Sequence, residues 1–466
     1  MNSKLVSLFC CLIMLVSFSG CTKVTQLVKD NQPTKAELLA EINEEHQRWE
    51  AAPAADPTPY LRHYDDPADA QKYFDYVTDT YSEYNAAKEL SLEEAEEDVN
   101  YLFDAFYYDF AFYDYFGGHT VFDQAKAEIL QELQAKDNLT CKDLQEVLVK
   151  HLTFIKDGHF NINHNFPAEK EIPFFFRQVM FVKTDSGYQD SKGKTVVSVD
   201  GHPDLDTLFK RSISQEGYLV YYPVLLKEAK FDGTEWDKHV CDEQLTVHYA
   251  DGSTDVLTAD AWRQYYKELP KDQNTDLRQT DGIPVFQFNS FDGSFLQEVN
   301  AAAAQMSDAA ISMLDLRSNV GGYEEVAHQW ITRYSRQRVQ GNGVRYDVVN
   351  PVSVAIQAHR WQTHDNILIL LSGKCSASSA EITMDLAYNL ENSLIIGENT
   401  NGCMIGNGGH VELPNSKCSV IMTFVCVYLL PEGADYFEEM CGLSPDIWVP
   451  AGEAETLAAK LMKNLK

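Results

Sequence analysis

The sequence has little positive charge, no cysteine pair at metal-ligand spacing, and only one long apolar run, at its N-terminus. Its 70 acidic residues outnumber 38 basic ones, and the formal net charge of -32 would repel nucleic-acid phosphates. We therefore expect no nucleic-acid partner. Without a C-x-x-C motif, the cysteines predict neither a zinc site nor a redox dithiol. Without a second run of about eighteen apolar residues, the rest of the chain is not expected to cross a membrane.

The single apolar run covers residues 5–18 and ends in two small residues before Cys21. A charged start, an apolar run shorter than a membrane span and small residues before a cysteine are typical of a bacterial lipoprotein signal. We predict that residues 1–20 are a signal peptide and that Cys21 carries the lipid. The protein would then be anchored in the bacterial cell envelope, at the outer membrane, on its periplasmic or surface face. The alternative is an ordinary signal peptide with an incidental cysteine, because Phe18 is bulkier than the usual leucine.

The cysteines that follow the leader are odd in number, so at least one of them should be a free thiol. Export would permit disulfides, but the spacing of these residues leaves their pairing open. They are Cys141, Cys241, Cys375, Cys403, Cys418, Cys426 and Cys441.

The first part of the mature chain should be a tether followed by a helical domain. Residues 21–59 are expected to form the tether, with one short helix from Thr34 to Glu50 before a stretch rich in proline and alanine. Residues 60–170 are expected to form a small helical domain, because aromatic and aliphatic residues recur there at helical spacing. Such aromatic stripes usually belong to a core.

The second part should contain a β-rich module and an α/β domain. In residues 171–280, Leu245–Tyr249 and Thr254–Leu257 flank a short turn and predict a hairpin within a small β-rich module. Over residues 281–466, apolar strand-like runs alternate with helical stretches. This alternation predicts an α/β domain with a mainly parallel sheet and functional loops at the strand ends.

One strand-to-helix turn of the α/β domain carries a candidate nucleophile. The apolar run Ile367–Leu371 is followed within seven residues by Ser378, which lies among small residues and opens a helix. Small neighbours let a substrate carbonyl approach, and the helix N-terminus favours a developing negative charge. By itself, a serine at such a turn is more often a plain helix N-cap.

A second turn, after residues 311–316, ends in the glycine pair Gly321 and Gly322. Paired glycines let backbone N–H groups face a ligand at close range. They could supply one half of an oxyanion hole, and the amide of Ser379 could supply the other half. Asp315 and Arg317, at the start of this turn, are better explained as a buried ion pair.

Together these motifs resemble the C-terminal-processing, or tail-specific, serine peptidase family. The resemblance covers residues 283–450 and includes Asp315–Gly322, Ser376–Glu381, Gly397–Gly402 and Gly442–Ile447. It implies a Clp-protease/crotonase-like fold for the α/β domain and the hydrolysis of peptide bonds. It also implies an inserted PDZ-like module, for which the β-rich region is the candidate, although that region has no G-L-G-F loop to bind a carboxylate.

The resemblance also implies a catalytic triad. Where the tail-specific branch has a basic lysine, this chain has Cys403, and Lys374 is an alternative base that precedes the turn. The branch that includes the tricorn protease core resembles the chain more closely, since it uses serine, histidine and glutamate. His159, in an Asp-Gly-His motif, matches its base, and Glu439, three residues before a glycine, matches its acid, with the adjacent Glu438 as the alternative.

No metal or cofactor is implied, because His164, the one histidine near His159, is not part of an H-E-x-x-H motif. The first hypothesis is therefore an exported, lipid-anchored peptidase that acts on peptides or unfolded protein through Ser378, His159 and Glu439. The second is a catalytically inactive lipoprotein that binds peptides or apolar ligands on the same scaffold. A surface-adhesion or nutrient-capture lipoprotein is the third. The oligomeric state is not predicted.

Overall fold

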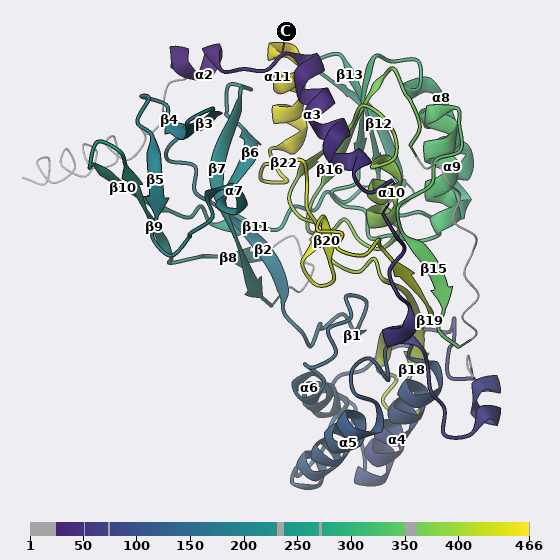
Figure 1. Cartoon of the computed structure of the whole chain (residues 1–466). Helices are drawn as coiled ribbons and strands as arrows, with labels where there is room; N and C mark the ends of the chain where they lie inside the picture. Colours follow the sequence, from purple (N-terminus) through teal and green to yellow (C-terminus); the bar gives the residue numbers. More distant parts are fainter. Residues whose placement is uncertain are drawn as a thin grey trace, which may run out of the picture.

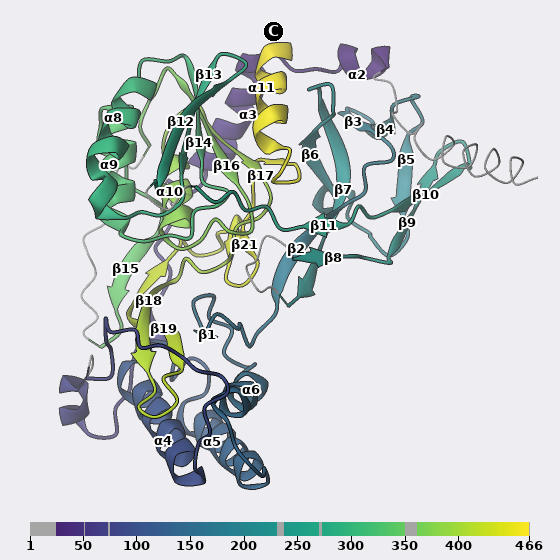
Figure 2. The same cartoon turned by 180° about the vertical axis from the view of Figure 1, so that it is seen from behind.

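The computed structural model describes residues 25–50, 52–72, 75–230, 237–269, 273–349 and 361–465. The predicted signal peptide and Cys21 lie outside these residues. An α/β domain and a β-rich module lie next to each other, and three helices form the opposite end of the molecule (Figures 1 and 2). Within the described part, no helix is both long and apolar enough to span a bilayer. All seven cysteines described are free thiols.

The α/β domain has the predicted parallel sheet. Its strand order is β12-β13-β14-β16-β17-β22, in which β12 is an antiparallel edge and the other neighbours are parallel. The strands are β12 (Thr275–Thr280), β13 (Ile283–Phe288), β14 (Ile311–Asp315), β16 (Ile367–Ser372), β17 (Ser393–Gly397) and β22 (Ile447–Trp448). Five-residue runs of Ile and Leu form such strands because both faces of a parallel sheet are buried.

Helices cover both faces of this sheet. One face packs against α8 (Leu296–Met306), α9 (Glu324–Ser335) and α10 (Ser379–Ala387). The other face packs against α11 (Ala454–Asn464) and α3 (Lys35–Gln47). The α/β domain therefore has three layers, and its loops at the carboxyl ends of β14 and β16 include the two predicted motifs.

The position of α3 corrects the expectation that residues 21–59 are a tether and that folding starts near residue 60. The short α2 (Gln26–Asp30) precedes it, and the helix begins at the capping box of Thr34 and Glu37. Leu38 and Ile42, one helical turn apart, are buried in the sheet-facing core. This apolar stripe makes the segment part of the folded body.

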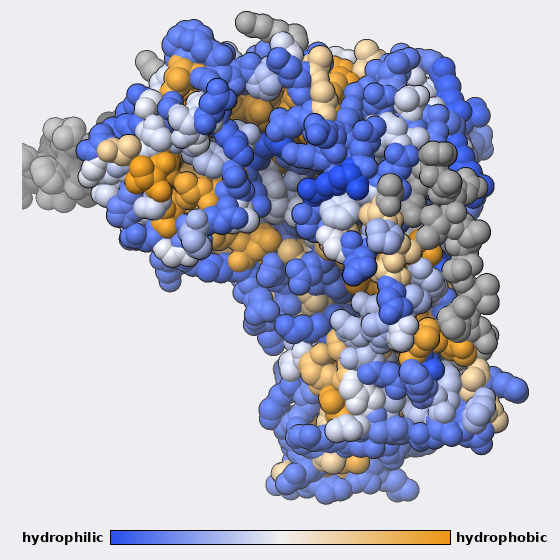
Figure 3. Space-filling model, in the orientation of Figure 1, coloured by the Kyte–Doolittle hydropathy of each residue, from blue (hydrophilic) through white to orange (hydrophobic). Residues whose placement is uncertain are grey.

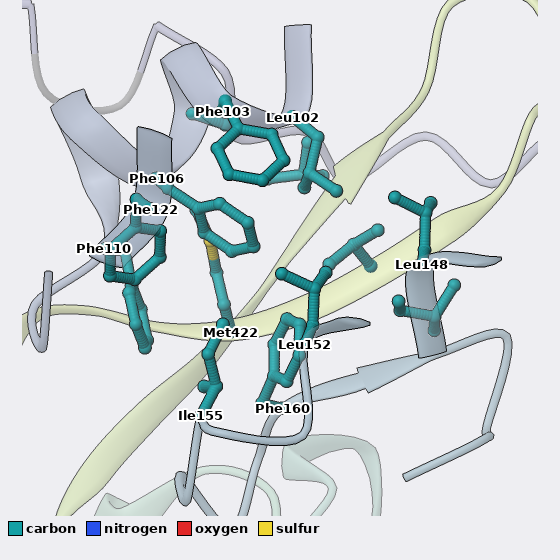
Figure 4. Close-up of a cluster of buried hydrophobic side chains, with 14 of the residues drawn as sticks. Leu102, Phe103, Phe106, Phe110, Phe122, Leu148, Leu152, Ile155, Phe160 and Met422 are labelled. Carbon is teal, nitrogen blue, oxygen red and sulfur yellow. The ribbon is translucent and has the colours of Figure 1, made fainter. Parts of the chain in front are cut away.

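The predicted helical domain consists of α4 (Leu92–Asp109), α5 (Gly118–Gln134) and α6 (Cys141–His151). Its aromatic residues form a core, as expected, and Figure 4 shows Phe106, Phe110 and Phe122 within it. Met422 also lies in this cluster, although it comes from β19 (Ser419–Leu429). The helices therefore share a core with the C-terminal third of the chain and do not form a separate unit.

A second sheet connects the helical region to the α/β domain. In it, β19 pairs with β1 (Asn161–Ile162), β15 (Val344–Asp347) and β18 (Gly406–Glu412). Because β1 follows the predicted Asp-Gly-His motif directly, this sheet fixes the motif against residues that are more than 240 positions later in the chain.

The β-rich module contains the predicted hairpin, with Val247 opposite Asp255. Its last paired strand ends at Arg263, and β12 already belongs to the α/β sheet, so the module is shorter than residues 171–280. A PDZ-like identity for it stays a prediction. Its elements are β2 (Lys170–Phe175), β3 (Phe181–Thr184), β4 (Gly187–Asp190), β5 (Val196–Val199), α7 (Leu205–Leu208), β6 (Phe209–Ile213), β7 (Leu219–Ala229), β8 (Lys238–His239), β9 (Gln244–Tyr249), β10 (Thr254–Thr258) and β11 (Trp262–Arg263).

The surface agrees with the acidic composition. Figure 3 shows a face that is mostly hydrophilic, with a few separate apolar patches. Scattered patches of this kind are normal on a soluble domain.

Candidate active site

Ser378 lies on a strained turn between β16 and α10. Its backbone has φ 54° and ψ -116°, a left-handed conformation that is uncommon for a residue with a side chain. The Ser378 side chain is half-buried at the N-terminus of α10. A serine on such a strand-to-helix turn has its hydroxyl presented to solvent and its backbone close to the helix dipole.

The carboxylate of Glu381 holds this turn in place. It is fully buried and accepts hydrogen bonds from the amide of Ser378 at 2.9 Å, from the amides of Gly402 at 2.7 Å and Cys403 at 3.0 Å, and from the hydroxyl of Thr400 at 2.5 Å. The turn of the nucleophile candidate is thus tied to residues 400–403. The motif contains Glu381, but the sequence gives no indication of this role.

The loop with the glycine pair packs directly against the serine turn. The Ala377 amide donates to the Asn319 carbonyl at 2.9 Å, and the Ser379 hydroxyl donates to the Gly322 carbonyl at 2.7 Å. The Gly321 amide donates to the side chain of Asn319 at 2.8 Å. Among the described residues, no hydrogen bond engages the amide of Gly322 or Ser379, so these two donors are available to a ligand.

Gly321 leaves no room for a side chain. Its φ is +94°, and a Cβ would lie 2.8 Å from the Cβ of Ser378 and 2.9 Å from the carbonyl oxygen of Ala377. We expect Gly321→Ala to slow the labelling of Ser378 by a fluorophosphonate by about tenfold to a hundredfold, because a displacement of about 1 Å at a reacting group has effects of this size.

Gly252→Ala is the matched control for this variant. Gly252 has a similar φ of +81°, but no atom lies within 4 Å of the position of its Cβ. Both substitutions strain the backbone, whereas only the first disturbs Ser378. Equal labelling rates of the two variants, measured by in-gel fluorescence, would contradict the close packing argument.

Asp315 and Arg317 form the buried ion pair that the sequence predicts. Arg317 Nε lies 2.7 Å from one carboxylate oxygen of Asp315, and a terminal nitrogen lies 2.7 Å from the other. The guanidinium also contacts Glu455 at 2.9 Å. This network joins the end of β14 to α11 and has a structural role.

His159 is held at the junction of the helical core and the second sheet. Phe160, the next residue, is buried with its ring 5.8 Å from that of Phe106 (Figure 4). The carboxylate of Asp157 accepts hydrogen bonds from the His159 amide at 3.0 Å and from the amide and hydroxyl of Thr423 at 3.1 and 3.0 Å. The backbone of this histidine is therefore fixed from both sides.

The side chain of His159 is about 10% exposed, and its two ring nitrogens are buried without a hydrogen-bond partner. Burial is the main reason that the pKa of His159 falls to about 3, and the nearby Lys170 ammonium lowers this pKa further. The ring is accordingly neutral at physiological pH. A neutral imidazole with a free nitrogen is the form that can accept a proton.

Glu439 lies beside this imidazole, and Glu438 does not. Glu438 is exposed in β20 (Phe437–Glu438). Glu439 accepts hydrogen bonds from the amide of Gly158 at 2.8 Å and from that of Ile405 at 3.3 Å. Burial, and then the negative charges of Asp157 and Glu381, raise the pKa of Glu439 well above its usual value.

Two of the predicted triad residues, His159 and Glu439, are neighbours, but no hydrogen bond joins their side chains. Potential ligand atoms of Asp157, His159 and Glu439 all lie within 4.8 Å of one another. Cys403 contacts both the serine turn and the histidine motif. The Ser378 amide contacts the Cys403 thiol, and a Cβ on Gly158, the residue before His159, would lie 2.6 Å from the Cys403 Cβ. No hydrogen bond links the described Ser378 and His159 side chains.

Two buried lysines flank this region. Lys374, the alternative base, donates to the carbonyls of Thr400 at 2.7 Å and Cys441 at 2.8 Å, and burial lowers its pKa to about 7. Lys170, which sequence reasoning missed, donates to the carbonyl of Gly158 at 2.9 Å and to the side chain of Asn401. Lysine at the start of a strand gives no sequence signal of burial.

Asp157, His159 and Glu439 are also the one group in the described ranges whose spacing suits a metal ion. The fully buried Lys170 ammonium next to this group opposes the entry of a second cation. The neighbouring ammonium therefore disfavours a metal centre at these three residues.

Comparisons with known proteins agree with the serine turn and the glycine loop. Residues 282–449 match the model of peptidase family S41, a range that includes Ser378, Glu439 and both glycines but not His159. No curated protein sequence matches the chain. Among solved structures, mature CPAF in complex with lactacystin is similar over 80% of this chain and 97% of its own, with 13% identity and a TM-score of 0.43.

Two other solved structures are similar to the same extent. The photosystem II D1 C-terminal processing protease aligns over 80% of this chain and 97% of its own, with 15% identity and a TM-score of 0.38. A putative peptidase from Parabacteroides merdae aligns over 81% and 98%, with 17% identity and a TM-score of 0.38. Since these TM-scores are below 0.5, the assignment rests on the family match. The family resemblance is thus confirmed over residues 282–449, which match the model of peptidase family S41, a family of serine hydrolases.

Proposed function

We propose that this protein is an exported serine peptidase in which Ser378 is the nucleophile, His159 the general base and Glu439 the acid that stabilises the imidazolium. The observation that supports this most strongly is the left-handed backbone of Ser378 at the N-terminus of α10, in a domain of a serine peptidase family. Its substrates would be peptides or unfolded segments of protein, because an extended chain can enter a half-buried site.

The proposed reaction uses one proton transfer in each direction. The Ser378 Oγ attacks the carbonyl carbon of the scissile bond while its proton passes to His159. The amides of Gly322 and Ser379 donate to the oxyanion, and Gly321 leaves the space for it. His159 then returns the proton to the leaving amine, and a water molecule hydrolyses the acyl-enzyme by the same steps.

The unpartnered imidazole is compatible with this proposal. Catalytic hydrogen bonds are often long in a free enzyme and form only with substrate present. Ionised Glu439 would stabilise the imidazolium once it forms, and Asp157 would add to this effect. Both carboxylates are within reach of the ring without a change of fold.

Export and lipid anchoring at Cys21 are part of the proposal and rest on the leader sequence. The apolar run and the small residues before the cysteine support a place in the bacterial cell envelope. Radiolabelled palmitate incorporation into the wild type and into Cys21→Ser would test the anchor.

A fluorophosphonate probe should label the purified chain without its signal peptide, and Ser378→Ala should abolish this labelling. The probe reacts only with an activated serine hydroxyl, so ordinary surface serines are not labelled. Ser186→Ala, which changes an exposed serine in the β-rich module, is the control and should be labelled like the wild type. The adduct is mapped by mass spectrometry after digestion.

A catalytically inactive binding protein on the same scaffold is the second candidate. The replacement of the family lysine by Cys403 and the lack of a hydrogen bond from His159 to Ser378 favour it. A folded wild-type protein that the probe does not label would support this candidate and would exclude the peptidase.

A further inference from the structure

An aromatic pocket lies where the three regions of the chain meet. This cavity of about 550 Å³ has Tyr60, Phe112, Tyr115 and Phe116 on the side of the helical region. The rings of Tyr60 and Tyr115 stack with their centroids 4.8 Å apart, and Phe112 meets Tyr60 edge-on at 5.8 Å. Tyr115 is nevertheless 50% exposed, so this aromatic wall is open to a ligand.

Much of the remaining lining comes from the loop between β19 and β21 (Gly442–Leu443), which includes Phe437 and Glu439, the acid of the proposed triad. Burial, the neighbouring Tyr115 and the charge of Glu439 raise the pKa of Tyr60 to about 12, so the phenol of Tyr60 lies in the field of this carboxylate. A group bound in the pocket would therefore be next to Glu439 of the proposed triad.

The lining of the pocket is strongly acidic. Six glutamates line it against the single basic residue Lys156, and Lys156 already lies 3.6 Å from one of them, Glu228. The ratio of acidic to basic residues is therefore higher in the pocket lining than in the whole chain, which has 70 acidic and 38 basic residues. The glutamates are Glu169, Glu171, Glu228, Glu432, Glu438 and Glu439.

We propose that this pocket is a substrate subsite that binds a large apolar or aromatic side chain next to a lysine or arginine in an extended peptide. The inference rests on the proposed peptidase function and names the substrate class of the same site. The aromatic wall would bury the apolar side chain, and the glutamates would attract the neighbouring cation.

The size of the pocket fits a short segment of peptide. Its volume is within the range of about 300–1,000 Å³ that is typical of small-ligand sites. A larger cavity of about 1390 Å³ lies along α8 and α9, but no proposed catalytic residue lines it. The aromatic pocket is therefore the better candidate for substrate recognition.

Peptide binding to the Ser378→Ala protein tests the subsite without catalysis. Four fluorescein-labelled peptides of one length would contain Phe-Lys, Phe-Glu, Ser-Lys or Ser-Glu at the same central positions. We expect the Phe-Lys peptide to bind about tenfold or more tightly than the Ser-Glu peptide in fluorescence anisotropy, since an apolar side chain in a matching pocket has an effect of this size. Equal dissociation constants for the four peptides would overturn the proposal.

Two substitutions in the same background assign the preference to this pocket. Tyr115→Ala should remove the advantage of Phe over Ser, and Glu169→Lys should remove that of Lys over Glu. Tyr81→Ala is the matched control, because Tyr81 is an aromatic residue with 67% exposure outside the pocket. If Tyr115→Ala and Tyr81→Ala bind all four peptides alike, the pocket is not the subsite.

Fluorophosphonate labelling separates this proposal from the proposed function. Labelling of the chain with an intact Ser378, together with selective binding of the Phe-Lys peptide in the Ser378→Ala background, supports both. Selective binding by a protein that the probe does not label supports the subsite and excludes the peptidase. Labelling by the probe with no selectivity among the four peptides supports the peptidase and excludes the subsite.

Discussion

His159→Ala should lower kcat for a peptide substrate by about 10³-fold to 10⁶-fold, the range found when the histidine of a serine peptidase is removed. This variant lacks the neutral imidazole that we propose as the acceptor of the Ser378 proton. The carboxylates of Asp157 and Glu439 would remain, but in the proposed mechanism they act on the imidazole and not on the serine hydroxyl. Peptide cleavage followed by fluorescence, with the circular dichroism spectrum as a check of folding, measures the effect.

Lys374→Met is the matched comparison, because it removes the alternative base. Burial lowers the pKa of Lys374 to about 7, which would suit a base, but its ammonium donates to the carbonyls of Thr400 and Cys441. We expect this variant to retain fluorophosphonate labelling. Labelling that persists in His159→Ala and disappears in Lys374→Met would show instead that the lysine is the base.

The architecture of the α/β domain can be predicted because its signals are local. The run Ile367–Leu371 is apolar at every position, which favours a strand that is buried on both faces. The helix after it begins at small residues, and the sequence predicts its start within one residue of α10. Strand type, order of elements and the serine turn follow from such short patterns.

The packing of α3 cannot be predicted in the same way. Its capping box at Thr34 and Glu37 predicts a helix, but whether the helix packs depends on distant residues. His46 contacts Asp446 at 2.8 Å, and Arg211 contacts Glu45 at 2.6 Å. These partners are more than 160 positions away, and a stripe of two apolar residues alone does not identify them.

In the candidate site, too, local patterns predict the residue types but not their contacts. The motifs indicate Ser378, His159 and Glu439 one by one, while the contacts between them depend on the fold. Asp157 belongs to the histidine motif, and its carboxylate is 3.8 Å from a nitrogen of the His159 ring. This position depends on β19, because Thr423 of that strand donates a hydrogen bond to the carboxylate. Lys170 is buried by its contacts with Gly158 and Asn401, which no local pattern reveals.

Lys170→Met should move the acid limb of the pH profile of kcat/KM to higher pH by about one to two units. The active form needs a neutral His159 and an ionised Glu439. The Lys170 ammonium lowers the pKa of both groups, so its removal raises both. Each change makes the active form require a higher pH, and the two shifts therefore have the same sign.

The position of this limb distinguishes an electrostatic role from a structural one. A lysine that only connects Gly158 to Asn401 would, when replaced, lower the plateau of the profile and leave the limb in place. Phe166→Leu is the control, because the Phe166 ring lies 4.7 Å from the Lys170 ammonium and its loss leaves the charge intact. We expect its acid limb to coincide with that of the wild type. A Lys170→Met protein with an unchanged limb and a normal melting temperature would show that Lys170 does not set the protonation of His159 and Glu439.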